Sequence, residues 1–247
     1  NRGYTPESLK SFALTVAISK RENVIDASLL EFCVRAHLNE EAPRAMAVLD
    51  PLKMSIINYK ENKAESVDFD INPQNPSQEK REILFSKIIY IEREDFQENP
   101  EEGFFRLSLG EEVRLKNAYI IKATNIIKNE QGKITEVECE YDEKSKSGSN
   151  TPESNRKVKA TVHWVSAQTA VDATINIYDR LFKVPEPGKS QDLLSEVNEN
   201  SLEIKSAKVE PYLANAKEGD HFQFQRSGYF VRTNNKKTLE FNKTVGL

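Results

Sequence analysis

The spacing of apolar residues changes near residue 44. Before that point, apolar side chains recur at intervals of three and four over residues 9–16 and 30–34, as on one face of a helix. Thr5, which precedes Pro6, and Asp26 further along are residues that favour helix starts. We therefore expect two helices, the second ending before Pro43, because proline disfavours helix in the residue that precedes it.

After residue 44 the chain consists of short β-rich runs separated by turn residues. The runs span 44–49, 52–59, 83–91, 104–109, 113–127, 134–141, 158–165, 170–178, 202–209, 222–226, 229–232 and 239–245. Residues 129–132 form a hairpin turn sequence. Residues 143–157 carry no apolar side chain, so we expect an exposed, mobile loop there. So many short strands predict barrels or sandwiches rather than a parallel sheet, and no internal repeat has a fixed period.

Composition narrows the class of protein. The chain has 247 residues, a net charge of -4 at pH 7 and 30% charged side chains. No run of 18 apolar residues occurs, which excludes a membrane-spanning helix, and the first residues lack the apolar stretch of a secretory signal. Cys33 and Cys139 lie far apart in sequence and fit a reducing compartment. We expect a soluble cytoplasmic protein of one or two domains.

Signatures of catalysis are absent from the sequence. Neither a Gly-x-Gly-x-x-Gly nor a Gly-x-Ser-x-Gly pattern occurs, and Gly188-Lys189-Ser190 lacks the earlier glycine of a phosphate-binding loop. His37, His163 and His221 have no metal-ligand spacing. We expect no catalytic, cofactor-binding or metal-binding residue, and a structural, hydrogen-bonded role for His163.

Positive charge collects in two parts of this acidic chain. Residues 103–133 include six basic and three acidic side chains, and residues 205–247 include eight basic and four acidic ones. Arg114 and Lys116 are spaced to share one face of a strand, while Gln223 lies among aromatic residues. Arginine and glutamine side chains read base edges, and aromatic rings stack on unpaired bases. The pattern suggests single-stranded RNA binding, although solvated strand faces would produce the same charge and aromatic residues in strands are usually part of the core.

Five segments of the chain resemble, in order, the anticodon-binding region of the glutaminyl-tRNA synthetase family. They are Leu38-Asn39-Glu40-Glu41-Ala42-Pro43-Arg44-Ala45-Met46-Ala47-Val48, Leu109-Gly110-Glu111-Glu112-Val113-Arg114-Leu115-Lys116-Asn117-Ala118-Tyr119, His163-Trp164-Val165-Ser166, Tyr178-Asp179-Arg180-Leu181-Phe182 and Phe241-Asn242-Lys243-Thr244-Val245-Gly246-Leu247. The resemblance covers the whole chain. That family belongs to the class I aminoacyl-tRNA synthetases.

The resemblance implies a mainly β fold. A short helical segment would lead into two six-stranded antiparallel β-barrels of the ribosomal protein L25 type. Residues 1–43 would form a helical connector from the catalytic core. Residues 44–58 plus about 166–247 would form a proximal barrel, and about 59–165 a distal barrel.

The resemblance also implies a tRNA anticodon site made of eight residues. They are Arg44, Arg106, Arg114, Lys116, Gln223, Arg226, Asn39 and Thr244. Arg44 and Gln223 would approach the middle anticodon base, Arg106 would serve the third base, and Arg114 with Lys116 would lie near the first. Lys116 stands where the family has arginine, and residues 103–105 replace a more polar stretch beside the third-base pocket.

The function implied is recognition of the anticodon stem-loop of glutamine tRNA, so that the parent protein attaches glutamine using ATP. ATP and magnesium would bind an upstream catalytic domain, and this part would hold no cofactor. We expect a cytoplasmic monomer that does not bind membranes. Two alternatives are the anticodon-binding domain of an archaeal or eukaryotic type glutamyl-tRNA synthetase, and a protein-interaction barrel that does not contact RNA.

Overall fold

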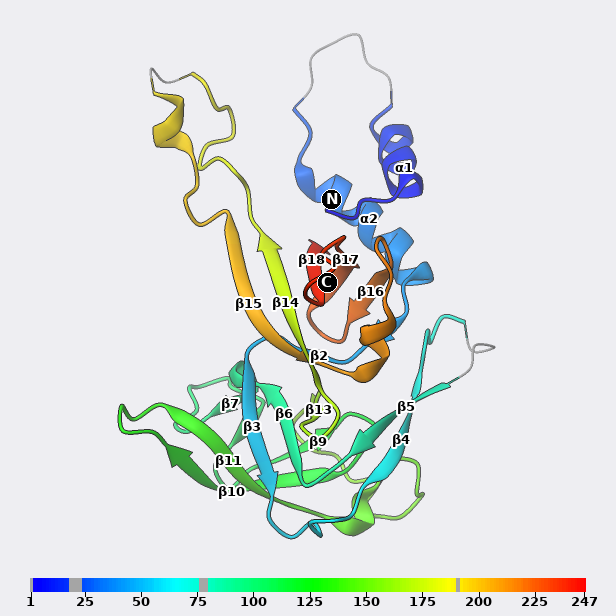
Figure 1. Ribbon diagram of the computed structural model, residues 1–247, viewed down its shortest axis with the longest axis vertical. Helices are drawn as coiled ribbons and strands as arrows, with labels where there is room; N and C mark the ends of the chain where they lie inside the picture. Colours follow the sequence, from blue (N-terminus) through cyan, green and yellow to red (C-terminus); the bar gives the residue numbers. More distant parts are fainter. Residues whose placement is uncertain (1, 18–23, 76–79, 190–191) are drawn as a thin grey trace.

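The computed structural model describes residues 2–17, 24–75, 80–189 and 192–247 (Figure 1). Two helices come first, α1 (Pro6–Val16) and α2 (Ala27–Glu41), as expected. The side chains of Thr5 and Asp26 accept hydrogen bonds from the first-turn amides of Ser8 and Ser28, which explains where the helices begin. Helix α2 packs on the neighbouring sheet through Leu38 and other apolar residues.

The sheet next to the helices, which we call the proximal barrel, is closed by one short stretch of chain. Its strands are β1 (Arg44–Ala45), β2 (Ala47–Val48), β14 (Val171–Tyr178), β15 (Leu202–Val209), β16 (His221–Phe224), β17 (Gly228–Arg232) and β18 (Glu240–Val245), in the order β1-β16-β17-β18-β14-β15-β2. Strands β1 and β2 occupy opposite edges yet are consecutive in sequence. Residues 44–48, the proximal closing segment, therefore join the two edges and close the sheet on itself.

The second sheet, the distal barrel, lies at the far end of the molecule from the helices (Figure 1). Its strands are β3 (Pro51–Ile56), β6 (Ile88–Glu92), β9 (Glu112–Leu115), β10 (Ile120–Lys128), β11 (Ile134–Tyr141), β12 (Thr161–Val162) and β13 (Val165–Ser166), in the order β12-β9-β10-β11-β3-β6-β13. Residues 161–166, the distal closing segment, join the edges of this sheet in the same way. Each barrel thus consists of six stretches of chain, as expected.

The barrels are mainly antiparallel, as predicted, but each also contains parallel pairs that the prediction did not include. In each barrel two of the six neighbouring pairs are parallel: β1 with β16 and β14 with β18, and likewise β12 with β9 and β11 with β3. These neighbours are far apart in sequence or joined by long connections, so no hairpin forces them to run in opposite directions.

Two ribbons and several short helical turns complete the described chain. Strands β4 (Glu65–Asp70) and β5 (Lys80–Phe85) form a two-stranded ribbon, and β7 (Phe96–Gln97) pairs with β8 (Leu107–Ser108). The 3₁₀ turns are η1 (Arg93–Asp95), η2 (Glu143–Ser145), η3 (Leu193–Glu196) and η4 (Pro211–Asn215). Among the described residues, no helix has the length and apolar character needed to span a membrane.

The two cores meet at the proximal closing segment. Its residues alternate: Ala45 and Ala47 pack in the proximal core, while Met46 and Val48 pack in the distal core. This alternation follows from the period of two along an extended chain. The polypeptide then enters β3, which pairs with β11 and β6. The first segment of the proximal barrel therefore ends near residue 48 in the structure, before the predicted boundary at residue 58.

Local structure differs from the predictions in three other places. The predicted strand 113–127 is a hairpin, β9 and β10, because Asn117 adopts a left-handed conformation with φ of 58°. Strand β4 was not predicted. Residues 143–157 pack on the distal barrel, where the Ser145 hydroxyl is fully buried and accepts a hydrogen bond from the Ile120 amide at 2.7 Å. Hydroxyl and backbone groups hold this segment in place of apolar contacts.

Candidate nucleic-acid interface

Three of the predicted residues meet where helix α2 ends. The Arg44 guanidinium donates to the Ala42 carbonyl at 2.8 Å and to the Asn39 carbonyl and side-chain oxygens at 3.0 and 2.8 Å. Burial lowers the pKa of Arg44. Gln223 lies directly beside Arg44, because β1 and β16 pair in this register. We call Asn39, Arg44 and Gln223 the helix-end group.

A shallow hollow of about 350 Å³ opens beside the helix-end group. Phe32, Asn39, Gln223 and Tyr229 are among the residues that line it. Phe32 is 62% exposed, and Tyr229 donates to the Asn39 side chain at 3.3 Å. An aromatic wall with amide groups at its edge suits an unpaired base.

Arg106 and Arg226 meet on a single carboxylate. Arg226 binds Asp95 with both terminal nitrogens, Nη1 to Oδ2 at 2.7 Å and Nη2 to Oδ1 at 2.8 Å. Arg106 Nη1 lies 3.1 Å from the same Oδ1. The hydrogen bonds that Arg226 donates to Asp95 raise the pKa of Arg226, so its charge is permanent. Asp95, Arg106 and Arg226 form what we call the junction group, since Arg226 comes from the proximal barrel and the other two from the distal part.

The junction group adjoins the contact between the two closing segments. His163 is buried, and its Nε2 lies 3.0 Å from the Ala47 carbonyl and 3.4 Å from a Glu92 carboxylate oxygen. Two acceptors at Nε2 mean that this nitrogen carries a proton. Arg226 Nη1 approaches the other ring nitrogen at 3.5 Å. His163 is therefore a structural, hydrogen-bonded residue, as predicted.

Arg114 and Lys116 are held differently from each other. The Arg114 guanidinium donates to the Ser145 and Ser154 carbonyls at 3.0 and 2.7 Å and to the Ser147 hydroxyl at 3.2 Å. Burial, helped by the nearby charge of Arg156, lowers the pKa of Arg114. Lys116 lies just past the end of β9, in the turn, and in the described parts of the chain its ammonium has no partner. Arg114 thus holds the 143–157 segment, whereas Lys116 offers a free charge.

Thr244 lies apart from the helix-end and junction groups and from Arg114 and Lys116. It is fully buried in β18, and its hydroxyl has no hydrogen-bond partner among the described residues. Gly3 covers it so closely that a β-carbon at Gly3 would lie 2.6 Å from the hydroxyl oxygen. We therefore leave Thr244 out of the candidate interface.

Strands β16 and β9 hold equivalent places in the two barrels. Each runs parallel to a closing segment, with Gln223 opposite Arg44 and Arg114 opposite Thr161. The amides of Gln223 and Arg114 donate to the Pro43 and Ala160 carbonyls at 2.8 and 2.9 Å. The side chains of Gln223 and Arg114 lie on the outer faces of β16 and β9, whereas the residues on either side of each one point into the barrel cores. Two predicted contact residues thus occupy the same position in the two barrels.

The equivalence continues into the following turns. Three residues after Gln223 and Arg114 come Arg226 and Asn117, both left-handed with φ of 66° and 58°. The amides of Gln225 and Lys116 donate to the Ala45 and Val162 carbonyls, each at 2.9 Å. Lys116 also accepts a hydrogen bond from Trp164 on its carbonyl, so Lys116 and Arg226 both adjoin the 162–164 stretch. The candidate interface therefore extends across the junction of the barrels.

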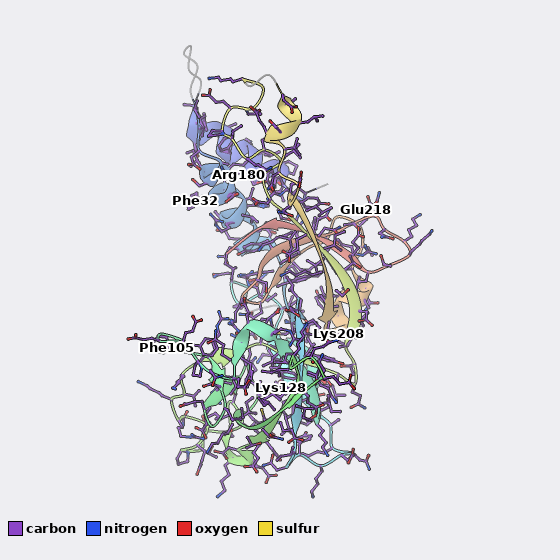
Figure 2. The ribbon with its side chains drawn as sticks, turned by 90° about the vertical axis from the view of Figure 1, so that its left-hand side faces the viewer. Phe32, Phe105, Lys128, Arg180, Lys208 and Glu218 are labelled. Carbon is purple, nitrogen blue, oxygen red and sulfur yellow. The ribbon has the colours of Figure 1, made fainter. Side chains whose placement is uncertain are left out.

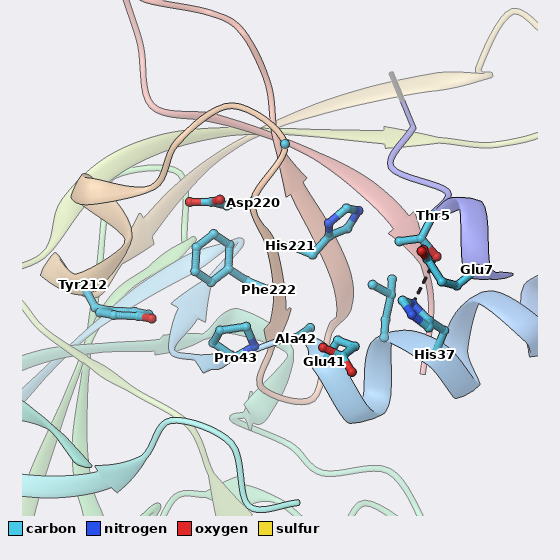
Figure 3. A pocket seen from close by; sticks show the side chains of 12 residues that line it. Thr5, Glu7, His37, Glu41, Ala42, Pro43, Tyr212, Asp220, His221 and Phe222 are labelled. Carbon is cyan, nitrogen blue, oxygen red and sulfur yellow. Dashed lines mark hydrogen bonds between the residues drawn. The ribbon is translucent and has the colours of Figure 1, made fainter. Parts of the chain in front are cut away.

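A larger hollow near α2 contains none of the eight predicted residues. It measures about 730 Å³ and is lined by His37, His221 and Asp220, among others (Figure 3). His37 bonds Thr5 at 3.1 Å, and His221 Nε2 lies 2.7 Å from the Gly3 carbonyl oxygen. Its histidines are thus bound to the N-terminal segment. No group of His, Cys, Asp and Glu residues that could hold a metal occurs in the described ranges.

Asp95 and Phe105 were not among the predicted site residues. Asp95 is followed by Phe96 in an acidic stretch, and nothing in its sequence neighbourhood marks it as buried. Phe105 precedes Arg106 and is 70% exposed, projecting from the distal barrel (Figure 2). An aromatic residue in a β-rich run is more often part of the core, so the sequence Gly103-Phe104-Phe105 did not mark Phe105 as exposed.

Comparison with known sequences identifies the family. Two segments, residues 42–142 and 161–233, match the family described as tRNA synthetases class I (E and Q), anti-codon binding domain. The first covers most of the distal barrel with the proximal closing segment, and the second begins at the distal closing segment. The chain belongs to this family of anticodon-binding domains.

Relatives narrow the similarity further. The chain is 46% identical over 249 aligned residues to a glutamine–tRNA ligase of Aliivibrio fischeri, and 46% identical to one of Idiomarina loihiensis. It is 45% identical to a glutamine–tRNA ligase of Cronobacter sakazakii. Each match covers the whole of this chain but only about 45% of the relative. The chain therefore corresponds to somewhat less than half of these ligases.

Proposed function

We propose that this chain recognises the anticodon loop of glutamine tRNA, and that the protein containing it attaches glutamine to that tRNA using ATP. The observation that carries the proposal is the equivalent placement of Gln223 and Arg114 on strands β16 and β9. Both outer faces flank the junction, so unpaired bases bound there would be read by amide and cationic groups from both barrels. The similarity to glutamine–tRNA ligases supplies the choice of tRNA.

Within this interface we assign roles by accessibility. Gln223 and Asn39 border the hollow beside Tyr229, so they would contact the middle anticodon base. Arg106, with 37% of its side chain exposed, would contact the third base. Lys116 would supply a point charge near the first base, and Arg114 would keep the neighbouring 143–157 segment in place. Arg44 would orient Asn39 through two hydrogen bonds.

The proposal also covers the oligomeric state, the cellular location and the cofactors of the protein. The protein would act as a monomer in the cytoplasm, where its tRNA partner occurs. ATP and magnesium would bind a catalytic domain elsewhere in the same protein. The family description includes glutamate as well as glutamine enzymes, so a glutamate tRNA is the competing substrate that an experiment must test.

The direct test measures binding of this chain to RNA hairpins. Hairpins carrying the glutamine anticodon stem-loop should bind more tightly than hairpins with the glutamate anticodon or with single anticodon substitutions. Affinity should fall steeply with salt, and Lys116→Gln should reduce the slope of log K against log[salt] by about 1. Gln223→Ala should weaken discrimination at one base by about fivefold or more, since a paired base contact supplies about 1–3 kcal/mol.

Two results would contradict the proposal. Equal affinity for all hairpins would show that the interface does not read the anticodon, and binding that does not depend on salt would favour a protein-interaction barrel. In the intact protein, Arg114→Ala and Gln223→Ala should raise the KM for tRNA and leave the KM values for ATP and glutamine unchanged. Preference for glutamate tRNA in charging assays would reassign the substrate.

A further inference from the structure

A single buried carboxylate joins arginines from the two barrels. Asp95 is 0% exposed and lies in η1, directly after strand β6 of the distal barrel. Arg226, in the turn between β16 and β17, occupies both of its oxygens at 2.7 and 2.8 Å. Arg106 adds a third contact at 3.1 Å. Asp95 therefore determines where two of the proposed RNA-binding residues lie relative to each other.

Burial of the Asp95 carboxylate does not require a second arginine, Arg106. A bidentate pair with Arg226 already satisfies both oxygens of Asp95 and balances its charge. Arg106 leaves the cluster with one net positive charge at a partly exposed position, 37% accessible. The other carboxylate near Arg106, Glu94 at 3.1 Å, is 74% exposed and therefore strongly screened by water. A guanidinium at a surface whose other ion-pair partner is an exposed, water-screened carboxylate is suited to an anionic or polar ligand.

Arg106 is fixed along one edge only. Its Nη1 contacts Asp95 and Glu94. In the described ranges of the chain, no hydrogen bond involves its Nε or Nη2. A guanidinium has five N–H donors in a rigid plane, so fixing Nη1 sets the direction of the remaining donors. Those donors can form the paired hydrogen bonds by which arginine reads a base.

We propose that Asp95 is a positioning residue for RNA recognition: it holds Arg106 by one nitrogen, leaves the other donors available to an unpaired base, and couples that base contact to the proximal barrel through Arg226. This inference rests on the proposed function. Asp95 itself is buried and does not touch RNA. Its role is to keep one base-reading group in register with the rest of the interface.

The test compares discrimination rather than affinity alone. Hairpins that differ at one anticodon position at a time are bound to the wild-type chain and to Arg106→Ala, which identifies the base that Arg106 reads. Asp95→Asn should reduce discrimination at that base by about fivefold or more and leave discrimination at the base affected by Gln223→Ala unchanged. Glu94→Gln, which removes the exposed partner of Arg106, is the matched control and should change discrimination by less than twofold.

A double-mutant cycle separates positioning from general loss of structure. If Asp95 acts through Arg106, Asp95→Asn should cause no further loss of discrimination at that base when Arg106 is already alanine. Should Asp95→Asn remove the β-sheet circular dichroism signal, Arg226→Lys decides the question. This variant keeps the charge but loses the bidentate contact, and it should reduce discrimination at the same base by about threefold or more, as a partial loss of the proposed 1–3 kcal/mol.

The outcomes distinguish this inference from the proposed function. If the wild-type chain does not discriminate among hairpins, the proposed function fails and this inference fails with it. If the wild-type chain discriminates but folded Asp95→Asn discriminates equally well, only the role of Asp95 is overturned. Additive losses in the double-mutant cycle would also overturn it, because they would show that Asp95 acts independently of Arg106.

Discussion

The proximal and distal barrels are built on one plan with different starting points. Read from β1 around the proximal barrel and from β12 around the distal barrel, the pairs are parallel, antiparallel, antiparallel, parallel, antiparallel and antiparallel in both. The closing segment comes first in the proximal barrel and last in the distal one. The two barrels are therefore circular permutations of each other.

The permutation explains where the candidate interface lies. The chain passes from the proximal closing segment straight into the distal barrel, and from the distal closing segment straight back (Figure 1). Both closing segments must therefore lie at the junction, where His163 contacts the Ala47 carbonyl. Strands β16 and β9 pair with these segments, so their outer faces flank the junction. Residues far apart in sequence are brought to one region by this topology.

The barrels differ in how polar groups enter their interiors. The distal core holds an aromatic cluster in which Glu65 accepts hydrogen bonds from Tyr59 and Tyr119 at 2.9 and 2.8 Å and from Lys146 at 2.7 Å. The proximal core is lined by phenylalanines such as Phe224 and Phe230, whose stacked ring centroids lie 4.2 Å apart. Its buried carboxylate, Glu210, faces the distal barrel instead.

The largest expected effect follows from removing the charge of Glu210. Its carboxylate accepts from the Met46 amide at 2.9 Å and pairs with Arg81 of the β4–β5 ribbon at 2.9 Å. Glu210→Gln would leave the Arg81 charge buried without a counterion, since only 8% of that side chain is exposed. We expect the free energy of unfolding to fall by about 3–5 kcal/mol. Urea denaturation followed by fluorescence of Trp164, the only tryptophan, measures it.

An exposed ion pair on the proximal barrel is the matched control for this experiment. Lys208 lies 2.6 Å from Asp172, and the aspartate side chain is 82% exposed. Asp172→Asn should change the free energy of unfolding by less than about 1 kcal/mol. If Glu210→Gln were equally mild, the buried Arg81–Glu210 pair would contribute no more to stability than an exposed ion pair does.

The second largest expected effect is a loss of stability in acid that should arise from a carboxylate of the distal barrel, Glu65. Burial opposes ionisation of Glu65, but hydrogen bonds from Lys146, Tyr119 and Tyr59 lower its pKa to about 2. Because this folded-state pKa lies below the ordinary value, the stabilisation is present above about pH 4.5 and is lost as pH falls toward 2. We expect wild type to lose about 2 kcal/mol across this window through Glu65, after allowance for partial exposure.

Glu65→Gln should remove that part of the acid dependence. The variant should start less stable at neutral pH, and its Trp164-detected stability should fall less between pH 5 and 2. Glu140→Gln, which changes an exposed carboxylate on β11 of the same barrel, should keep the wild-type profile. Parallel pH profiles for wild type and Glu65→Gln would show that Glu65 is not the group responsible.

Local sequence patterns predicted the positions of helices, strands and turns better than they predicted which strands pair with each other. The helix starts at Thr5 and Asp26 were readable because capping is a local effect, and the 129–132 turn was confirmed by the Asn129 and Gly132 amide bonds. The closing segments were predicted only as single strands. Their role depends on partners distant in sequence, such as Gln223 for Arg44 and Tyr90 for Val165, which no local pattern encodes.

The candidate site was predictable to a similar extent. Arginine and glutamine side chains near aromatic residues indicated Arg106 and Gln223, and the resemblance implied Arg44. The structure brings Arg44 together with Gln223, and Arg106 together with Arg226. The sequence did not reveal that Thr244 is buried or that a carboxylate orients two of the arginines. Both facts arise from packing between segments distant in sequence.

The smallest expected effect on stability concerns the β6–β9 connection of the distal barrel and the equivalent β15–β16 connection of the proximal barrel. In the proximal barrel the β15–β16 connection tucks Tyr212 against Phe222, with ring centroids 6.0 Å apart. In the distal barrel the β6–β9 connection leaves Phe105 70% exposed beside Arg106. Phe105→Ala should change the free energy of unfolding by less than about 0.5 kcal/mol, because the side chain supports no core. The same variant should weaken hairpin binding by about fivefold, as expected for loss of about 1 kcal/mol of stacking on a base.

Leu194→Ala, which truncates an 80% exposed side chain distant from the junction in sequence, is the control and should bind hairpins like wild type. Unchanged affinity of Phe105→Ala would show that this ring does not stack on RNA, and a large loss of stability would show that it belongs to the fold.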